Sequence, residues 1–228
     1  MRVDINGAIV PNEDAEFYEV FGLDYCCPGQ IKQRIAENTD GVLDVYINSG
    51  GGSVFDGAEI YSELRSFPGP VYIHVTGLAA SAASVIACAG PSDISPAGML
   101  MIHNCSGSAF GDYHDMEKSA EILQKVNHAI AEAYAEKTGK DGRELLKLMD
   151  RETWMTAAEA VENGFIDAVA APKNTGLRPA AALGGGLIPQ AVLDKLRTDK
   201  VNASRKSDVL INKAKAELKL LSMKGSRT

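Results

Sequence analysis

Runs of apolar residues alternate with stretches of helical spacing over most of the chain. Short apolar runs predict β-strands at 3–10, 42–47, 71–76 and 99–103. Between them, apolar residues recur every three or four positions and predict helices at 28–38, 54–67, 81–89 and 112–137. The run at 42–47 is mostly apolar, which indicates a central strand. Strands that alternate with helices are typical of an α/β domain with right-handed crossovers.

Residues 141–169 carry signals for two further helices and a strand. Asp141 is placed to cap a short helix, and Thr156 with Glu159 has the spacing of a capping box for another. The segment 165–169 predicts a closing strand. After it the chain changes character, because AAALGGG at 180–186 is typical of a linker. We therefore predict a folded domain over residues 1–170 and a linker with a poorly ordered or helical tail over 171–228.

The charge is distributed unevenly between these two parts. The net charge is −7, but the segment from Ala171 onward has 12 Lys and Arg against 4 Asp and Glu, whereas the rest has 11 against 26. An acidic body with a basic tail argues against nucleic-acid binding by the folded part. A nucleic-acid role for the tail itself is a weaker alternative.

Hydrophobic runs, the N-terminal segment and the cysteines indicate the cellular compartment. No apolar run of about 18 residues is present, so no membrane-spanning helix is expected. The N-terminal segment has no apolar core of a signal peptide. The four cysteines, Cys26, Cys27, Cys88 and Cys105, lack metal-ligand spacing. Together these features predict a cytoplasmic protein with reduced thiols and no metal site.

The segment from Thr76 to Cys88, TGLAASAASVIAC, predicts a strand end, a sharp turn and a buried helix that begins at Ser81. Gly77 can adopt backbone angles that are closed to other residues. A serine at this place has its hydroxyl beside the first unpaired N–H groups of the helix, where it could act as a nucleophile. The alternative is that Ser81 only caps the helix.

A serine nucleophile needs a base, an acid that orients the base, and donors for the oxyanion. His103 ends the strand predicted beside the one that leads to Ser81, so both side chains are expected at one sheet edge. The alternative is a structural histidine at a strand end. His74 lies within a strand, and His114 and His128 lie on the long helix, so we expect these three to be structural or solvated.

The glycine-rich segment 50–52 and the N–H of Ala82 are candidates for the oxyanion donors. Glycines let the backbone approach a reacting carbonyl or hold an extended substrate. A phosphate-binding loop would need Lys and Ser or Thr next, whereas Val54 and Phe55 follow here. The dinucleotide-binding spacing and the G-x-S-x-G elbow are also absent.

Four blocks together resemble the Clp protease proteolytic subunit family, in particular its bacteriophage and prophage branch of head-maturation (prohead) proteases. The blocks are INSGGG at 47–52, GLAASAAS at 77–84, MIHN at 101–104 and TAAEAVENGFID at 156–167. The resemblance covers roughly residues 5–169. Their order and spacing make the match specific, which no single block would be.

The resemblance implies a role for each matching position. It makes Ser81 the nucleophile and His103 the general base, and it places the oxyanion donors at the N–H groups of Gly51 and Ala82. The adjacent Gly50 and Gly52 are then expected to bind substrate. Glu152 stands where cellular members have an aspartate, and Asp150 is the alternative acid.

The resemblance also implies a fold of stacked β-β-α units, the fold shared with crotonase-like enzymes, and a homo-oligomeric ring. The long helix at 112–137 would be part of the contact between rings. The implied activity is cofactor-free, ATP-independent serine endopeptidase action, with capsid or scaffold proteins of a phage as substrates. The alternatives are an inactive ring subunit and a crotonase-like acyl-CoA enzyme. A Ser-Lys peptidase is less compatible with the sequence, because no lysine lies near the site blocks.

Overall fold

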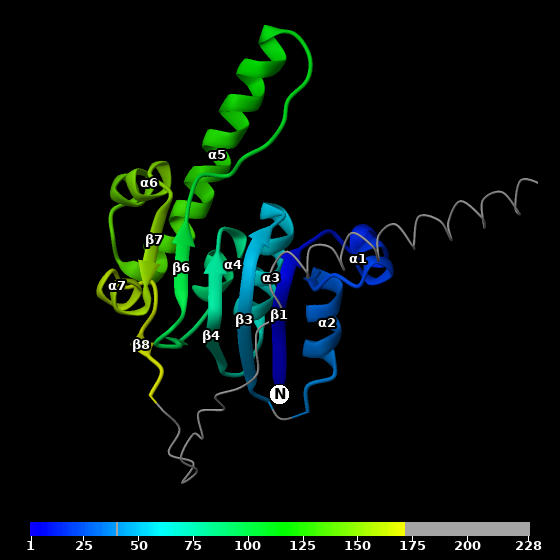
Figure 1. The fold of residues 1–228 in the computed structure, drawn as a ribbon, viewed down its shortest axis with the longest axis vertical. Coiled ribbons are helices and arrows are strands. Elements are labelled where there is room, and N and C mark those ends of the chain that lie inside the picture. The colour runs from blue at the N-terminus through cyan, green and yellow to red at the C-terminus, as the bar shows by residue number, and fades with distance from the viewer. Residues whose placement is uncertain (40, 172–228) are drawn as a thin grey trace, which may run out of the picture. The chain divides into compact units, whose positions relative to one another are not determined.

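The computed structural model describes residues 1–39 and 41–171 (Figure 1). In this part of the chain eight strands form one sheet in the order β2-β1-β3-β4-β5-β8, with β6 paired to β4 and β7 paired to β6. Every strand pair is parallel except β6 with β7. The strands are β1 (Arg2–Ile9), β2 (Tyr25–Cys26), β3 (Leu43–Gly52), β4 (Val71–Ala80), β5 (Ser92–Ile94), β6 (Met99–Ile102), β7 (Thr153–Thr156) and β8 (Ala168–Val169). The predicted α/β class with a parallel sheet is confirmed.

The helices begin where the sequence supplies caps. Asp112, Asp141 and Thr156 each accept a hydrogen bond from a backbone N–H of the helix that follows, and Pro28 occupies the first turn of its helix. The helical elements are η1 (Asn12–Asp14), α1 (Ala15–Phe21), α2 (Pro28–Ala36), α3 (Val54–Ser66), α4 (Ala82–Ala87), α5 (Tyr113–Thr138), α6 (Gly142–Asp150) and α7 (Ala157–Glu162).

Several elements differ from the sequence prediction, and the closing strand predicted at 165–169 is limited to β8 at Ala168–Val169. β3 continues through the glycines to Gly52, because Gly51 and Gly52 pair with Ala8 and Ile9 of β1 after a bulge. β4 continues to Ala80, because its last residues pair with β6. β7 was not predicted at all, and its antiparallel pairing with β6 defines it. The predicted linker at 180–186 and the tail after it lie outside the described residues.

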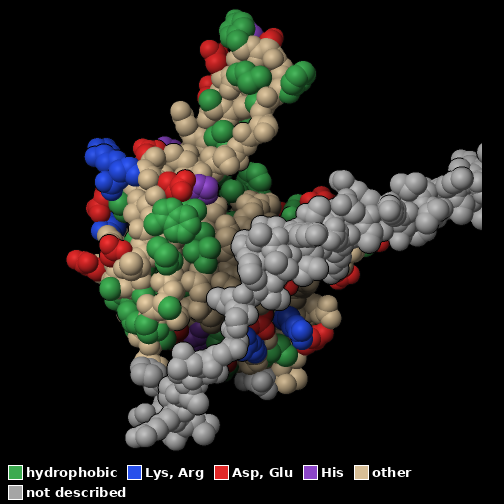
Figure 2. Space-filling view, in the orientation of Figure 1, with side chains coloured by type: hydrophobic (Ala, Val, Ile, Leu, Met, Phe, Trp, Pro, Cys, Tyr) green, Lys and Arg blue, Asp and Glu red, His purple; other side chains and the backbone are tan. Residues whose placement is uncertain are grey.

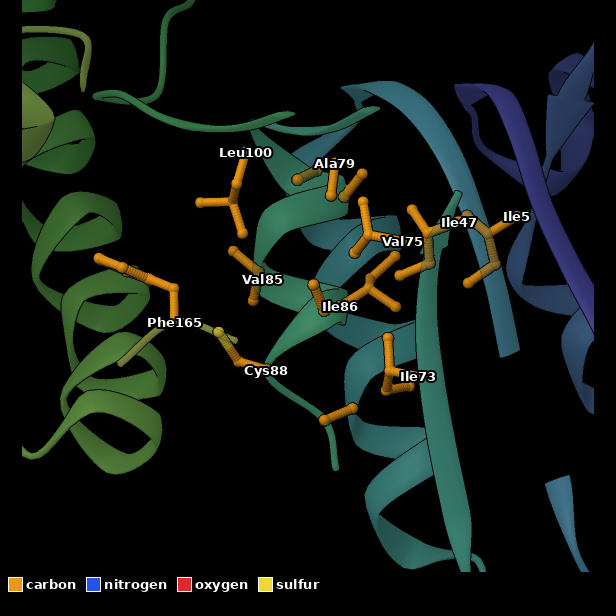
Figure 3. Close-up of a cluster of buried hydrophobic side chains, with 14 of the residues drawn as sticks. Ile5, Ile47, Ile73, Val75, Ala79, Val85, Ile86, Cys88, Leu100 and Phe165 are labelled. Atoms are coloured by element: carbon orange, nitrogen blue, oxygen red, sulfur yellow. The ribbon is translucent and has the colours of Figure 1, made fainter. Parts of the chain in front are cut away.

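Helix α4 lies at the centre of the hydrophobic core. It packs against β1, β3 and β4 and against α3 and α5. Ile86 of α4 faces Ile73 and Val75 of β4, and Phe165 closes the far side beside Cys88 (Figure 3). The opposite face of the sheet is polar, because Asp44 and Tyr46 alternate with buried residues along β3. β3 is therefore a central strand, as the apolar run at 42–47 had indicated, with one face buried and the other partly exposed.

Helix α5 has two different halves. Ala131 and Tyr134 in its C-terminal half are buried, whereas its N-terminal half projects beyond the sheet (Figure 1). Exposed apolar side chains gather on this projection, including Tyr113, Met116 and Ile122 (Figure 2). No helix among the described residues is both long and apolar enough to cross a membrane.

A half-buried lysine fixes the inner end of α5. Lys137 Nζ donates to the Gly90 carbonyl at 3.0 Å and to Asp167 Oδ2 at 2.6 Å, and Asp167 also accepts from the Ser92 N–H. Burial alone would raise the pKa of Asp167, but the hydrogen bonds from Lys137 and Ser92 outweigh it and lower that pKa. The C-terminal half of α5 is thus held to β5 and to the segment before β8.

Replacing Ile73 by alanine should destabilise the fold strongly, since its side chain is fully buried between the sheet and α4. We expect Ile73→Ala to lower the free energy of unfolding by about 2–5 kcal/mol. Urea denaturation followed by circular dichroism measures this value. The adjacent Tyr72, 44% exposed, is the matched control, and Tyr72→Ala should cost less than about 1 kcal/mol. Equal losses at both positions would contradict this description of the core.

Candidate active site

The parallel pairing of β4 with β6 brings Ser81 and His103 to the same sheet edge. Ala80 of β4 is in register with Met101 of β6, and each candidate residue follows its strand directly. The Ser81 N–H donates to the Met101 carbonyl at 2.9 Å, so this ladder extends as far as Ser81 itself. The predicted convergence of the two side chains is therefore seen in the structure.

Ser81 and His103 are in direct hydrogen-bond contact. Ser81 Oγ lies 2.8 Å from His103 Nε2. An imidazole nitrogen at this distance can accept the hydroxyl proton as the oxygen attacks an electrophile. This is the arrangement of a serine nucleophile with its base.

The backbone at Ser81 is strained. Its φ of 55° and ψ of −126° are unusual for a residue with a side chain, and its hydroxyl makes no capping hydrogen bond to the helix. Ser81 therefore occupies the N-cap position of α4 without capping the helix through its hydroxyl. Gly77 does not use the conformational freedom of glycine, because its φ is not positive. A Cβ there would lie 2.5 Å from Asn48 Oδ1, which accepts a hydrogen bond from the Leu78 N–H, so a larger residue would have to displace this side chain.

The first N–H of α4 is available as an oxyanion donor. Ala82 is the first residue of the helix, where no intrahelical acceptor exists, and no hydrogen bond from its N–H is seen within residues 1–39 and 41–171. Gly51 lies directly against this point. A Cβ on Gly51 would be 2.7 Å from Ser81 Cβ and 3.0 Å from the Ala82 nitrogen.

The N–H of Gly51, which was predicted to be an oxyanion donor, already donates a hydrogen bond within the protein. Its N–H donates to Ser49 Oγ at 3.0 Å, and Ser49 Oγ in turn donates to the Gly7 carbonyl at 2.6 Å. Gly50 is exposed beside the site, whereas Gly52 is paired with Ile9 in the sheet. The structure thus brings Gly51 to the nucleophile, but it does not point the Gly51 N–H at it.

Neither candidate acid is hydrogen-bonded to His103. The side chain of Glu152 accepts a hydrogen bond from Trp154 Nε1 at 3.1 Å, and Asp150 accepts from Asn104 Nδ2 at 2.8 Å. Among the described residues, Ser81 is the one hydrogen-bond partner of the His103 side chain. Glu152 and Ser81 are nevertheless the two non-glycine residues in this part of the chain with positive φ.

A cavity of about 220 Å³ opens at Ser81 and His103. Its walls are mostly apolar and come from α3, α4 and α5. Sequence reasoning did not connect these side chains with the site, because the same helical spacing is expected of core residues. They include Phe55, Ala58, Tyr61, Val85, Val126, Ile130 and Tyr134.

Cys105 is a second potential nucleophile on the wall of this cavity. Its Sγ donates to the Leu123 carbonyl at 3.3 Å, and burial raises the pKa of its thiol. A protonated thiol is a weak nucleophile and a weak metal ligand. Within the described residues, no group of three or more metal-binding side chains is placed to hold a metal ion, and all four cysteines are free thiols.

A serine and a histidine at the ends of adjacent parallel strands, with an unpaired helix N–H beside the serine, form a site of the serine hydrolase class. Comparison with known families gives the same class. The family model described as Clp protease matches residues 31–173, and the chain belongs to that family.

One curated relative is the ATP-dependent Clp protease proteolytic subunit 1 of Protochlamydia amoebophila (strain UWE25). It is 40% identical over 128 residues, which cover 54% of this chain and 62% of the relative. The chain therefore matches less than two thirds of that relative's length. The predicted family is confirmed, whereas neither match supports the phage branch in particular.

Replacing Gly51 by alanine should damage the site without unfolding the protein. The added methyl group would meet Ser81 and Ala82, and the φ of +89° at Gly51 is unfavourable for alanine. We expect the rate of labelling by a fluorophosphonate probe to fall at least about 100-fold. The control is Gly142→Ala, which fills open space in the first turn of α6. Labelling of Gly51→Ala at the wild-type rate would contradict this geometry.

Proposed function

We propose that the protein is a serine endopeptidase in which Ser81 is the nucleophile and His103 the general base. The observation that supports this most directly is the 2.8 Å contact between Ser81 Oγ and His103 Nε2. The unpaired N–H of Ala82 beside it supplies a donor for the oxyanion, and membership of the Clp protease family agrees with the chemistry.

The reaction proceeds by acyl transfer. Ser81 Oγ attacks the peptide carbonyl while His103 Nε2 accepts its proton, and the N–H of Ala82 donates to the resulting oxyanion. The protonated His103 then gives its proton to the leaving amine as the C–N bond breaks. Water attacks the acyl-enzyme with His103 again as the base, which releases the acid and restores Ser81.

Glu152 is the acid that we propose to orient His103. It is the position that matches the family acid, and its positive φ marks a strained backbone of the kind found at functional sites. A hydrogen bond to His103 requires the Glu152 side chain to leave Trp154 Nε1, an exposed contact. Asp150 is the less favourable alternative, because Asn104 Nδ2 already occupies its Oδ1.

The cavity beside Ser81 indicates which peptides are cleaved. Its apolar walls favour an apolar side chain next to the scissile bond, because burial of that side chain contributes binding free energy. The glycine-rich end of β3, with Gly50 exposed, lies where an extended substrate backbone would pass. The exposed apolar side chains on the projecting half of α5 would be covered in a homo-oligomeric ring.

Two variants separate a peptidase from an inactive ring subunit and from a crotonase-like enzyme, neither of which needs the Ser81–His103 pair. We expect Ser81→Ala and His103→Ala to lower kcat on a peptide substrate by on the order of 10⁴- to 10⁶-fold. Only Ser81→Ala should also abolish fluorophosphonate labelling completely. Turnover of the peptide by both variants at the wild-type rate would contradict the proposed peptidase function.

The same assay identifies the third residue. Glu152→Gln should lower kcat by at least about 100-fold, and Asp150→Asn should change it by less than about tenfold. The reverse order would assign the role to Asp150.

A more specific hypothesis about the substrate is that the peptidase cleaves its own segment 171–228. Its basic charge and its AAALGGG stretch motivate a role as an assembly segment that the peptidase removes, as in the maturation of phage capsids with scaffold or coat proteins as substrates. Intact-mass spectrometry after incubation should show loss of this segment from the wild type and retention in Ser81→Ala. An intact mass for both proteins would rule out self-removal.

A further inference from the structure

Two buried hydroxyl groups hold the carbonyl of the candidate nucleophile. Ser84 Oγ donates to the Ser81 carbonyl at 2.6 Å, and Tyr134 Oη lies 2.7 Å from Ser84 Oγ. The Ser84 N–H donates to the same carbonyl at 2.9 Å. Ser84 is 0% and Tyr134 is 1% exposed, so solvent does not compete for these contacts.

The direction of this hydrogen-bond chain follows from the number of protons. The single hydroxyl proton of Ser84 is given to the Ser81 carbonyl, so the short contact with Tyr134 requires the tyrosine hydroxyl to be the donor. Burial raises the pKa of Tyr134 far above its ordinary value, which keeps this proton in place. Phe165 packs edge-on against the Tyr134 ring at 5.4 Å and restricts its orientation.

The Ser81 carbonyl and the Ala82 N–H belong to one peptide group. That group is planar and trans, so any rotation that turns the carbonyl also turns the N–H. Rotation of this peptide group would relieve the backbone strain at Ser81. A carbonyl that accepts two hydrogen bonds resists this rotation.

We propose that Ser84 and Tyr134 are positioning residues that hold the Ala82 N–H towards the developing oxyanion. This inference rests on the proposed peptidase function and extends it to residues that do not touch the scissile bond. Because Tyr134 belongs to α5, the chain Tyr134–Ser84–Ser81 links the oxyanion donor to the helix whose other half projects from the body. The sequence analysis had assigned neither residue a role in the site.

The test uses the full chain with Tyr134→Phe, Ser84→Ala and the double variant. An oxyanion donor acts in the transition state, so we expect each single variant to lower kcat about tenfold and to change KM by less than about twofold. The double variant should lose no more than the worse single variant, because both residues act through one carbonyl. Tyr134→Phe keeps the ring, so the fold and the wall of the cavity are retained.

Inhibitor binding separates positioning from general loosening of the site. A peptide boronate forms a tetrahedral adduct with a serine nucleophile, whereas the same peptide ending in a carboxylate does not. The variants should bind the boronate about tenfold more weakly and bind the carboxylate peptide as the wild type does. The matched control is Ser92→Ala, which removes a buried serine hydroxyl bonded to Asp167 outside the site and should leave kcat unchanged.

Each result decides between the two hypotheses. The positioning role is wrong if the wild-type protein is active and the variants keep its kcat, or if they lose activity only through a higher KM. It is also wrong if their kcat falls no further than that of Ser92→Ala. In each of these cases the peptidase proposal stands. If wild-type protein neither hydrolyses peptides nor reacts with a fluorophosphonate, the peptidase proposal fails and the positioning role fails with it.

Discussion

The site depends on one strained junction, the turn between β4 and α4 at Ser81. The sheet holds this residue from one side, because its N–H donates to Met101 of β6. The helix holds it from the other side, because its carbonyl accepts from the N–H and the hydroxyl of Ser84. Between these two anchors the backbone adopts a φ of 55°, which aims the hydroxyl at His103 rather than at the helix. Such strain persists only where surrounding contacts fix it.

The hydrophobic core makes this junction possible. α4 is short, its residues are small, and all six are buried against the sheet and two neighbouring helices. Ile73 and Val75 of β4 pack against Ile86, so the strand that leads to Ser81 and the helix that follows it are rigid on both sides. A nucleophile on rigid elements keeps its geometry better than one on a loop.

Much of this could be predicted from the sequence. The spacing of apolar residues gave the main strands and helices, and the blocks around Ser81, His103 and Gly51 pointed to one sheet edge. Local patterns could not give the extension of β3 and β4, because ladder pairing across distant segments decides strand ends. They also missed β7, which exists through its pairing with β6. Nor could they show that the Gly51 N–H is bound by Ser49 or that Glu152 contacts Trp154, since side-chain partners depend on tertiary packing.

The most direct measurement is a crystal structure of the full chain after reaction with a fluorophosphonate. We expect a covalent bond from phosphorus to Ser81 Oγ and a phosphoryl oxygen about 3 Å from the Ala82 nitrogen. We also expect His103 Nε2 to stay within hydrogen-bond distance of the adduct. Phosphorus attached to another residue, or a phosphoryl oxygen directed away from the N-terminus of α4, would contradict it.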